Sequence, residues 1–254
     1  MEKARISISI DDGKKNFLSV ADKLIKLNIP ATLNIVPGAI DKSKKVEVET
    51  FSKEELVDLY KTGIFEIANH SNLHTNLEED IIEGRRKLVE WLNLDKNAPL
   101  GFASPGSEIK IKKALESEKR LREMGVLYLR THDEGGKEEY KRLDELYNKT
   151  KNPEYYVKKE SNAFYSKGDF AISSLVAYKG VNDLEEILLL TDHAVKEKKG
   201  LTIMFHNFAK PNEELYSNVW TFGSDRFYKF IEYIDNYRQQ GKLDILTSKD
   251  GLER

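Results

Sequence analysis

Short apolar segments alternate with amphipathic segments along most of the chain. In residues 5–10 every second residue is isoleucine, which predicts a β-strand, and in residues 16–27 apolar residues recur at helical spacing. Ser52 and Glu55 form a capping box, which predicts a helix that ends near Thr62. Further strands are predicted at residues 30–36, 64–68, 100–103, 126–129, 170–178, 201–205 and 243–246. Further helices are predicted at residues 76–92, 108–124, 182–198 and 224–240, with Asn76 and Asn182 as N-caps.

The order of these elements predicts the fold class. Strands and helices alternate, and only residues 133–167, which are charged and rich in tyrosine, form a long excursion with some helix. There is no linker and no repeat of fixed period. We therefore predict a single α/β domain over residues 1–254, built as a distorted (β/α) barrel of about seven parallel strands, similar to a TIM barrel. A doubly wound open sheet is the alternative.

Composition excludes several classes of protein. The chain has no cysteine, so disulfides, thiolate metal sites and thiol nucleophiles are excluded. The net charge of −2 lacks the basic excess of a nucleic-acid-binding protein. No apolar run is long enough for a transmembrane helix, and no apolar signal region precedes the first strand. We expect a cytoplasmic protein, or an extracellular one whose export signal has been removed.

Polar residues follow four of the predicted strands at the point where each strand ends. They are Asp11 and Asp12 after residues 5–10, His70 and His74 after 64–68, Ser104, Pro105 and Gly106 after 100–103, and His206 after 201–205. In a parallel barrel the carboxyl ends of the strands meet on one face, which is the reactive face. We therefore expect these residues to lie close together.

The spacing of two histidines indicates a metal site. His70 and His74 are four residues apart and can meet one ion, and a nearby carboxylate completes a His–His–Asp set that leaves open positions for water and substrate. Zinc is the ion expected from these ligands, and cobalt, nickel, manganese and iron are also compatible. Taken singly, each motif also fits a structural role: two turn histidines, an Asp-Gly turn, or a buried histidine at 206. Together with the other strand ends, His206 has the pKa range of a general acid.

The order of the motifs resembles the polysaccharide deacetylase family, also called the NodB-homology family or carbohydrate esterase family four. Residues 8–13, Ile-Ser-Ile-Asp-Asp-Gly, resemble its first motif, and residues 65–74, Phe-Glu-Ile-Ala-Asn-His-Ser-Asn-Leu-His, resemble its second. Residues 31–34, 102–106 and 203–206 resemble further motifs, so the resemblance extends from residue 5 to about residue 246. It implies that Asp11 is the catalytic base, that Asp12, His70 and His74 bind the metal, and that His206 is the general acid.

Two positions depart from the family pattern. The third motif of the family carries an arginine that orients the catalytic aspartate, and Ala103 occupies that place here. The fourth motif, of the Asp-x-x-Trp type, is not recognisable, and Thr131, His132 and Asp133 occupy the expected region. The sequence therefore leaves the partners of Asp11 and His206 unassigned.

We expect a metal-dependent hydrolase that removes N- or O-linked acetyl groups from a carbohydrate, with water at the metal as the nucleophile. The predicted substrate-binding residues are Ser104, Pro105, Gly106 and Trp220. Two alternatives remain open because of the departures. One is hydrolysis of another C–N bond, as in a cyclic imide or small amide, at the same site. The other is a catalytically inactive carbohydrate-binding homologue. No nucleic-acid partner is expected.

Overall fold

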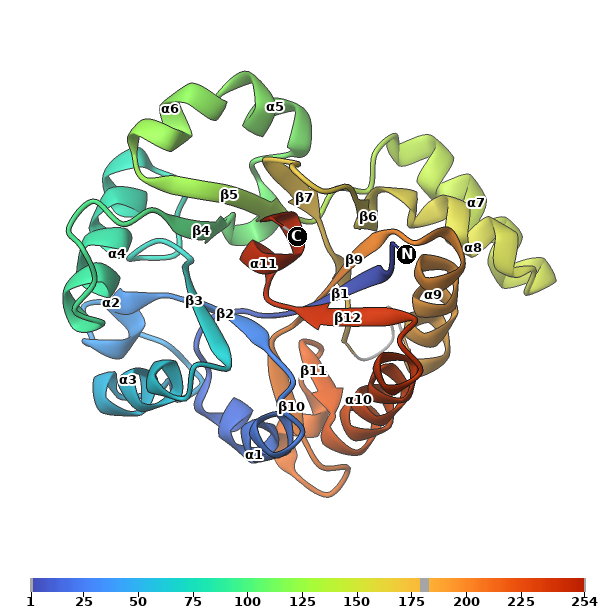
Figure 1. The fold of residues 1–254 in the computed structure, drawn as a ribbon, viewed down its shortest axis with the longest axis horizontal. Coiled ribbons are helices and arrows are strands. Elements are labelled where there is room, and N and C mark those ends of the chain that lie inside the picture. The colour runs from blue at the N-terminus through green and yellow to red at the C-terminus, as the bar shows by residue number, and fades with distance from the viewer. Residues whose placement is uncertain (1, 179–182, 254) are drawn as a thin grey trace.

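A ring of parallel strands lies at the centre of the computed structural model, which describes residues 2–178 and 183–253 (Figure 1). The strands of the ring are β1 (Ala4–Ile10), β2 (Ala31–Ile35), β3 (Phe65–Asn69), β4 (Leu100–Ala103), β5 (Val126–Thr131), β7 (Ala171–Ser173), β8 (Leu175–Val176), β9 (Gly200–Phe205) and β12 (Leu243–Leu246). The two-residue strand β6 (Phe164–Tyr165) adds to β9 in the antiparallel sense. A separate small ladder pairs β10 (Asn207–Ala209) with β11 (Thr221–Gly223).

One short stretch of chain closes the ring. Strands β1 to β5 pair in chain order, β7 pairs with β5, and β8 pairs with β9, which returns to β1. Because only Ser174 separates β7 from β8, residues 171–176 join the two ends of the sheet. The result is a nearly closed parallel barrel, so the predicted distorted (β/α) barrel is confirmed and the open sheet is wrong.

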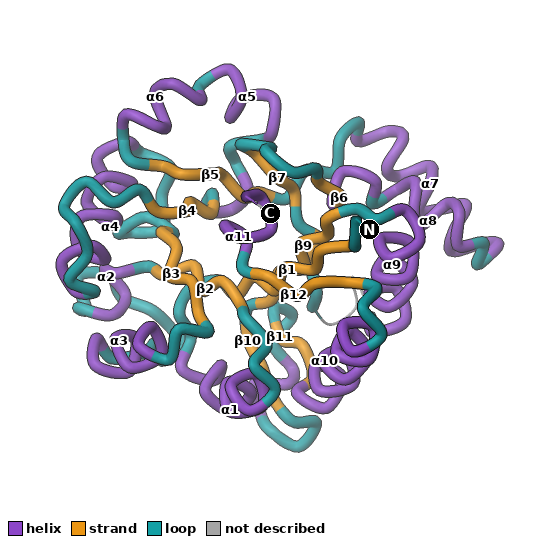
Figure 2. Tube along the Cα trace, viewed as in Figure 1, coloured by secondary structure: helices purple, strands orange, loops and turns teal. Residues whose placement is uncertain are grey.

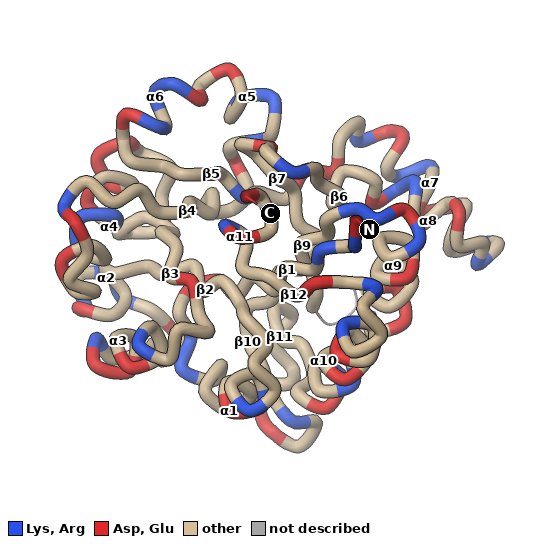
Figure 3. Tube along the Cα trace, in the orientation of Figure 1, with Lys and Arg blue, Asp and Glu red and all other residues tan. Residues whose placement is uncertain are grey.

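Helices surround the strands, as the purple segments in Figure 2 show. They are α1 (Leu18–Lys26), α2 (Pro37–Ile40), α3 (Lys53–Lys61), α4 (Glu78–Trp91), α5 (Ile111–Glu116), α6 (Glu118–Glu123), α7 (Lys137–Thr150), α8 (Pro153–Lys159), α9 (Leu184–Glu197), α10 (Ser224–Gln239) and α11 (Ser248–Glu253). Their apolar faces pack on the barrel, as at Phe227, Phe230 and Ile234 of α10, which are fully buried. Charges of both signs lie mainly on these outer elements (Figure 3). In the described part of the chain, no helix has the length and apolar character that crossing a membrane requires.

Helix α11 covers the end of the barrel where the strands begin. Leu252 packs with Tyr128, Tyr165 and Ile172, and the guanidinium of Arg5, near the start of β1, donates to the carbonyl of residue 251. Figure 1 shows α11 in the middle of the ring. The opposite end, where the strands finish, is therefore the open face.

The predicted start of α3 is confirmed, whereas that of α4 is wrong in detail. Ser52 accepts the Glu55 N–H and the Glu55 carboxylate accepts the Ser52 N–H, as a capping box requires. Asn76, by contrast, does not cap α4, whose N-cap is Leu77. The Asn76 amide instead donates to the carbonyl of Pro105, because the loop after β4 lies beside it.

Two other predicted elements are interrupted. The helix expected at residues 108–124 breaks at Ser117 into α5 and α6. The strand expected at 170–178 breaks at Ser174, whose hydroxyl donates to the carbonyl of Thr131. Asn182 lies outside the described residues, and the N-cap of α9 is Asp183.

Candidate metal and catalytic site

Asp12, His70 and His74 come together at the open face, after β1 and β3. The Nε2 atoms of His70 and His74 lie 3.6 Å and 3.4 Å from Oδ1 of Asp12. One ligand atom from each residue lies within 4.8 Å of the other two. Bonds of about 2.0–2.1 Å to a tetrahedral zinc ion place neighbouring ligands about 3.4 Å apart. The group therefore has the chemistry and the size that a divalent ion requires.

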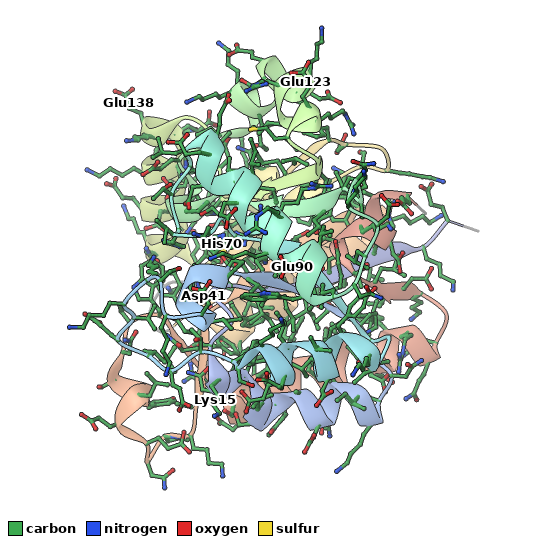
Figure 4. All side chains as sticks on the ribbon, turned by 90° about the vertical axis from the view of Figure 1, so that its left-hand side faces the viewer. Lys15, Asp41, His70, Glu90, Glu123 and Glu138 are labelled. Atoms are coloured by element: carbon green, nitrogen blue, oxygen red, sulfur yellow. The ribbon has the colours of Figure 1, made fainter. Side chains whose placement is uncertain are left out.

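The tautomer of His70 suits metal binding. Its Nδ1 lies 2.8 Å from the carbonyl oxygen of Ala103, and a carbonyl only accepts, so Nδ1 carries the proton. The lone pair of Nε2 then faces Asp12 and His74, an arrangement that orients ligating histidines in metal sites. Figure 4 labels His70 near the middle of the view, and only 2% of its side chain is exposed. Burial is the main cause that lowers the pKa of His74 to about 4, so the ring of His74 is neutral at pH 7.

Two of the three candidate ligands have backbone angles that are uncommon for their residue type. Asp12 has a φ of 72° and His74 a φ of 63°, both in the left-handed region. Such conformations cost free energy and persist where the surroundings impose them, as at binding sites. Both carboxylates approach Nε2 of His70, with Oδ1 of Asp12 at 3.6 Å and Oδ2 of Asp11 at 3.8 Å.

Helix α4 holds the loop that carries the two histidines. The carboxylate of Asp80 accepts the backbone N–H groups of Leu73, at 2.8 Å, and Thr75, at 3.1 Å. Gly84 lets the helix approach the loop closely, because a Cβ there would lie 2.4 Å from Oδ1 of Asn69. The histidine loop is therefore fixed on both sides of His74 before any ion binds.

Asp11 lies behind the metal-binding group as a buried carboxylate. Its Oδ1 accepts the side-chain amide of Asn34 at 2.8 Å and the guanidinium of Arg130. Its Oδ2 lies 3.8 Å from Nε2 of His70 and 3.8 Å from Nε2 of His206. Burial raises the pKa of Asp11, but nearby groups, with the Arg130 guanidinium first among them, outweigh burial and hold the pKa well below its usual range. Asp11 is thus ionised, with one oxygen directed toward both histidines.

Arg130 is a site residue that the sequence prediction missed. The predicted strand stopped at residue 129, whereas β5 continues to Thr131. Ala103 on β4 and Arg130 on β5 are paired neighbours in the sheet, so an arginine from the next strand reaches Asp11. Its side chain is only 1% exposed. The visible signal was an arginine within an apolar strand, which requires a buried anionic partner.

His206 follows β9 and faces Asp11 through Nε2. Its Nδ1 is buried and has no hydrogen-bond partner among the described residues. The ring lies against Trp220, with the centroids 5.1 Å apart. Burial lowers the pKa of His206, while the nearby carboxylates of Asp11 and Asp12 oppose that shift.

The region expected to hold the fourth family motif makes other contacts. Nδ1 of His132 lies 2.9 Å from the Ser174 carbonyl, and its Nε2 lies 3.5 Å from the Glu134 carboxylate. The Asp133 carboxylate accepts backbone N–H groups, including that of Ile111. His132 thus lies near the site, but its ring contacts do not include His206.

The loop after β4 offers a backbone donor rather than a side chain. The Ser104 hydroxyl donates to Asn76 and accepts the N–H of Ile109, and its own N–H donates to the carbonyl of Arg130. Pro105 is buried and has no N–H to offer. In the described part of the chain, the N–H of Gly106 has no backbone or side-chain acceptor.

These residues share one cavity of about 600 Å³, which is within the range of small-molecule sites. Its lining includes Asp11, Asp12, Ser104, Gly106 and four histidines, at positions 70, 74, 132 and 206. Trp220 is 45% exposed and also lines it, with its ring 4.8 Å from that of Tyr178. An aromatic surface therefore lies beside His206.

Comparisons with known proteins support the fold. No family model and no curated protein sequence matches the chain. The catalytic domain of a peptidoglycan N-acetylglucosamine deacetylase from Eubacterium rectale is 15% identical and superposes with a TM-score of 0.52, over 97% of this chain and 90% of that one. A family 4 acetyl xylan esterase from Clostridium thermocellum, in complex with a cobalt ion, is 14% identical over 97% and 89% of the two chains, with a TM-score of 0.49.

A polysaccharide deacetylase from Bacillus cereus is 24% identical, with a TM-score of 0.39. That match covers 50% of this chain and spans only 40% of the Bacillus cereus protein. The long superposition on the Eubacterium domain confirms the barrel fold that the sequence resemblance implied.

Proposed function

We propose that the chain is a metal-dependent hydrolase that removes N- or O-linked acetyl groups from a carbohydrate, with residues 1–254 acting as one catalytic domain. The observation that carries this proposal is the pairing of two groups in one cavity. Asp12, His70 and His74 form a set suited to a divalent ion, and Asp11 and His206 stand beside it as an ionised carboxylate and an imidazole. The fold shared with a deacetylase domain from Eubacterium rectale supports the same conclusion.

Asp12, His70 and His74 would hold the ion, and we propose zinc from the nitrogen and oxygen ligands. A divalent ion supplies Lewis acidity toward the acetyl carbonyl and toward water. Asp11 then accepts the proton of the attacking water, since its low pKa keeps it ionised and its Oδ2 faces the site. Arg130 and Asn34 keep the other carboxylate oxygen in place, so only Oδ2 is available for the proton.

His206 and the loop after β4 complete the chemistry. Nε2 of His206 lies on the cavity side, 3.8 Å from Oδ2 of Asp11, and donates a proton to the departing amine or alcohol. The N–H of Gly106 is the available donor of its loop for the oxyanion that develops on the acetyl oxygen. Trp220 and Tyr178 provide flat apolar surfaces for a sugar ring.

Metal content and acetate release test this proposal. Protein that has been stripped by a chelator and reloaded should bind one zinc per chain, His70→Ala should lose it, and His193→Ala, on α9 outside the cavity, should keep it. Asp11→Asn should keep zinc and lose activity roughly 10²–10⁴-fold toward acetylated oligosaccharides. A zinc-free protein, or an Asp11→Asn variant with unchanged turnover, contradicts the mechanism.

The alternatives raised by Ala103 lose much of their support, because Arg130 makes the contact with Asp11 that the family arginine makes elsewhere. A substrate panel still separates them. Release of product from a cyclic imide or small amide, with none from acetylated sugars, identifies the other C–N hydrolase. Glycan binding by zinc-loaded protein without any acetate release identifies the inactive homologue.

A further inference from the structure

One wall of the cavity carries lysine side chains that the proposed reaction does not use. Lys14, Lys44 and Lys45 line this wall, which we call the lysine wall, and the acidic residue beside them, Glu47, is exposed. Lys110 also lines the cavity, but its ammonium donates to the backbone carbonyl of His132. The ring of the same histidine contacts the Glu134 carboxylate. Positive charge is therefore concentrated on the lysine wall.

Two of these ammonium groups lie directly beside the candidate metal ligands. Nζ of Lys14 is 3.7 Å from Oδ2 of Asp12, and its side chain is only 13% exposed. Nζ of Lys44 donates to the carbonyl of Leu73, at 3.1 Å, one residue before His74. An ammonium group has three N–H donors. Among the described residues, Lys44 donates to one carbonyl, and Lys14 has one ion-pair partner at a distance too long for a hydrogen bond. Both lysines therefore have donors left for a ligand.

The charges around the two lysines are not balanced once an ion is bound. Arg130 already neutralises Asp11, and the negative charge of Asp12 would be shared with a divalent ion. Half-buried ammonium groups beside that ion then repel it and each other, which costs free energy unless an anion enters. Burial lowers the pKa of Lys44, and Lys14 adds to this shift, while the carboxylates of Asp12 and Asp80 oppose it.

We infer that the lysine wall binds a carboxylate or phosphate group carried by the acetylated sugar itself. The inference rests on the proposed function and specifies its substrate class: an acetylated acidic sugar, such as a uronic acid or a sugar phosphate. The anionic group lies on the same sugar residue as the acetyl group, because Lys14 contacts the very carboxylate that would hold the ion. A neutral polysaccharide would bring no anionic partner for the remaining donors of the two ammonium groups.

Calorimetric binding to zinc-loaded protein tests the inference in an Asp11→Asn background, which prevents turnover. The probes are N-acetylglucosamine, N-acetylglucosamine 6-phosphate and N-acetylglucosaminuronic acid, so phosphate and carboxylate are compared with a neutral sugar. We expect at least one anionic sugar to bind about tenfold or more tightly than the neutral one at low ionic strength. The preference should fall below about threefold in Lys14→Gln/Lys44→Gln and also in about 0.5 M salt.

The matched control is Lys15→Gln, which removes the same charge from the adjacent residue. Lys15 lies outside the cavity and pairs with Glu49 and Glu55, so this variant should keep the preference. Zinc content is measured for each variant. If Lys14→Gln lowers it, Lys44→Gln alone carries the test, since Nζ of Lys44 contacts a backbone carbonyl rather than a ligand side chain.

Two results overturn the inference. One is equal affinity of the zinc-loaded protein for neutral and anionic sugars. The other is a preference for anionic sugars that survives in Lys14→Gln/Lys44→Gln, which would mean that the ion alone binds the anionic group. Binding is measured without turnover, so the outcome is separate from that of the proposed function. A wild-type protein that releases no acetate refutes the hydrolase, whereas loss of the anion preference in the lysine variants still supports the lysine wall.

Discussion

Replacing Arg130 by methionine removes the cation that neutralises the buried Asp11 carboxylate. Arg130 and Asp11 are 1% and 2% exposed, so water cannot take the place of the guanidinium. Among the described residues, the Asn34 amide would be the one side-chain hydrogen-bond donor left to Asp11. Removing one partner of a buried ion pair costs about 3–5 kcal/mol, because a buried charge is left without compensation. We expect the free energy of unfolding of the metal-free protein to fall by about that amount at neutral pH.

Urea unfolding in the presence of a chelator measures the change, with Trp91 and Trp220 as fluorescent reporters. The matched control is Arg86→Met on the surface of α4, where the arginine pairs with exposed glutamates and should contribute only about 0–1 kcal/mol. In Asp11→Asn/Arg130→Met neither charge remains. This double variant should therefore be more stable than Arg130→Met alone by about 1–3 kcal/mol.

The reasoning is refuted if Arg130→Met costs no more than Arg86→Met, or if the double variant is no more stable than Arg130→Met. A second test measures activity and uses the pairing register between β4 and β5. Because Ala103 and Arg130 are paired neighbours, an arginine introduced by Ala103→Arg should restore part of the acetate release lost in Arg130→Ala. If acetate release is not restored, an arginine on β4 cannot replace one on β5.

Three smaller changes test other parts of the structure. Gly84→Ala should weaken zinc binding and lower the free energy of unfolding by about 1–3 kcal/mol, because the added Cβ would lie 2.4 Å from the Asn69 side chain. The control Gly136→Ala should change neither quantity, because nothing lies within 4 Å of the added Cβ. Equal effects of the two variants in zinc titration and urea unfolding contradict this prediction. Burial raises the pKa of Glu66 above its ordinary 4.5, so ionisation costs the folded state stability as pH rises through that pKa. The stability of Glu66→Gln relative to wild type should therefore improve as the pH rises above 4.5, and a difference in urea unfolding that stays constant with pH refutes this. Ser52→Ala should cost about 1 kcal/mol in the same assay by removing the cap of α3, and no loss would show that the capping box contributes little.

Local signals were sufficient to predict most elements of the barrel. Each strand is a short apolar run between polar segments, and the predicted strands at 100–103 and 243–246 coincide with β4 and β12. The closure at Ser174 was not predictable in this way. Whether a strand continues or breaks there depends on pairing with β5 on one side and β9 on the other, which are distant contacts that no local pattern reports.

The candidate ligands were predictable because strand ends converge on one face of any parallel barrel. Arg130 was not, since a missing arginine at Ala103 says nothing about a replacement on the neighbouring strand. Likewise, the side chains of Ser104 and Asn76 satisfy each other through a contact between two loops. The sequence alone does not distinguish a polar loop residue that binds a substrate from one that is hydrogen-bonded to a neighbouring loop.

The pairing of β1 with β9 and β12 has a consequence for how the protein is made. The first half of β1, Ala4–Ser7, pairs with Leu243–Leu246 on one side and with the start of β9 on the other. On the ribosome this apolar strand emerges long before either partner, and its backbone edges stay open in the meantime. Contacts so distant in sequence also slow folding. Since the N–H of Asp11 is bonded to the carbonyl of Phe205, the end of β1 that carries Asp11 and Asp12 reaches its folded pairing only after most of the chain has been synthesised.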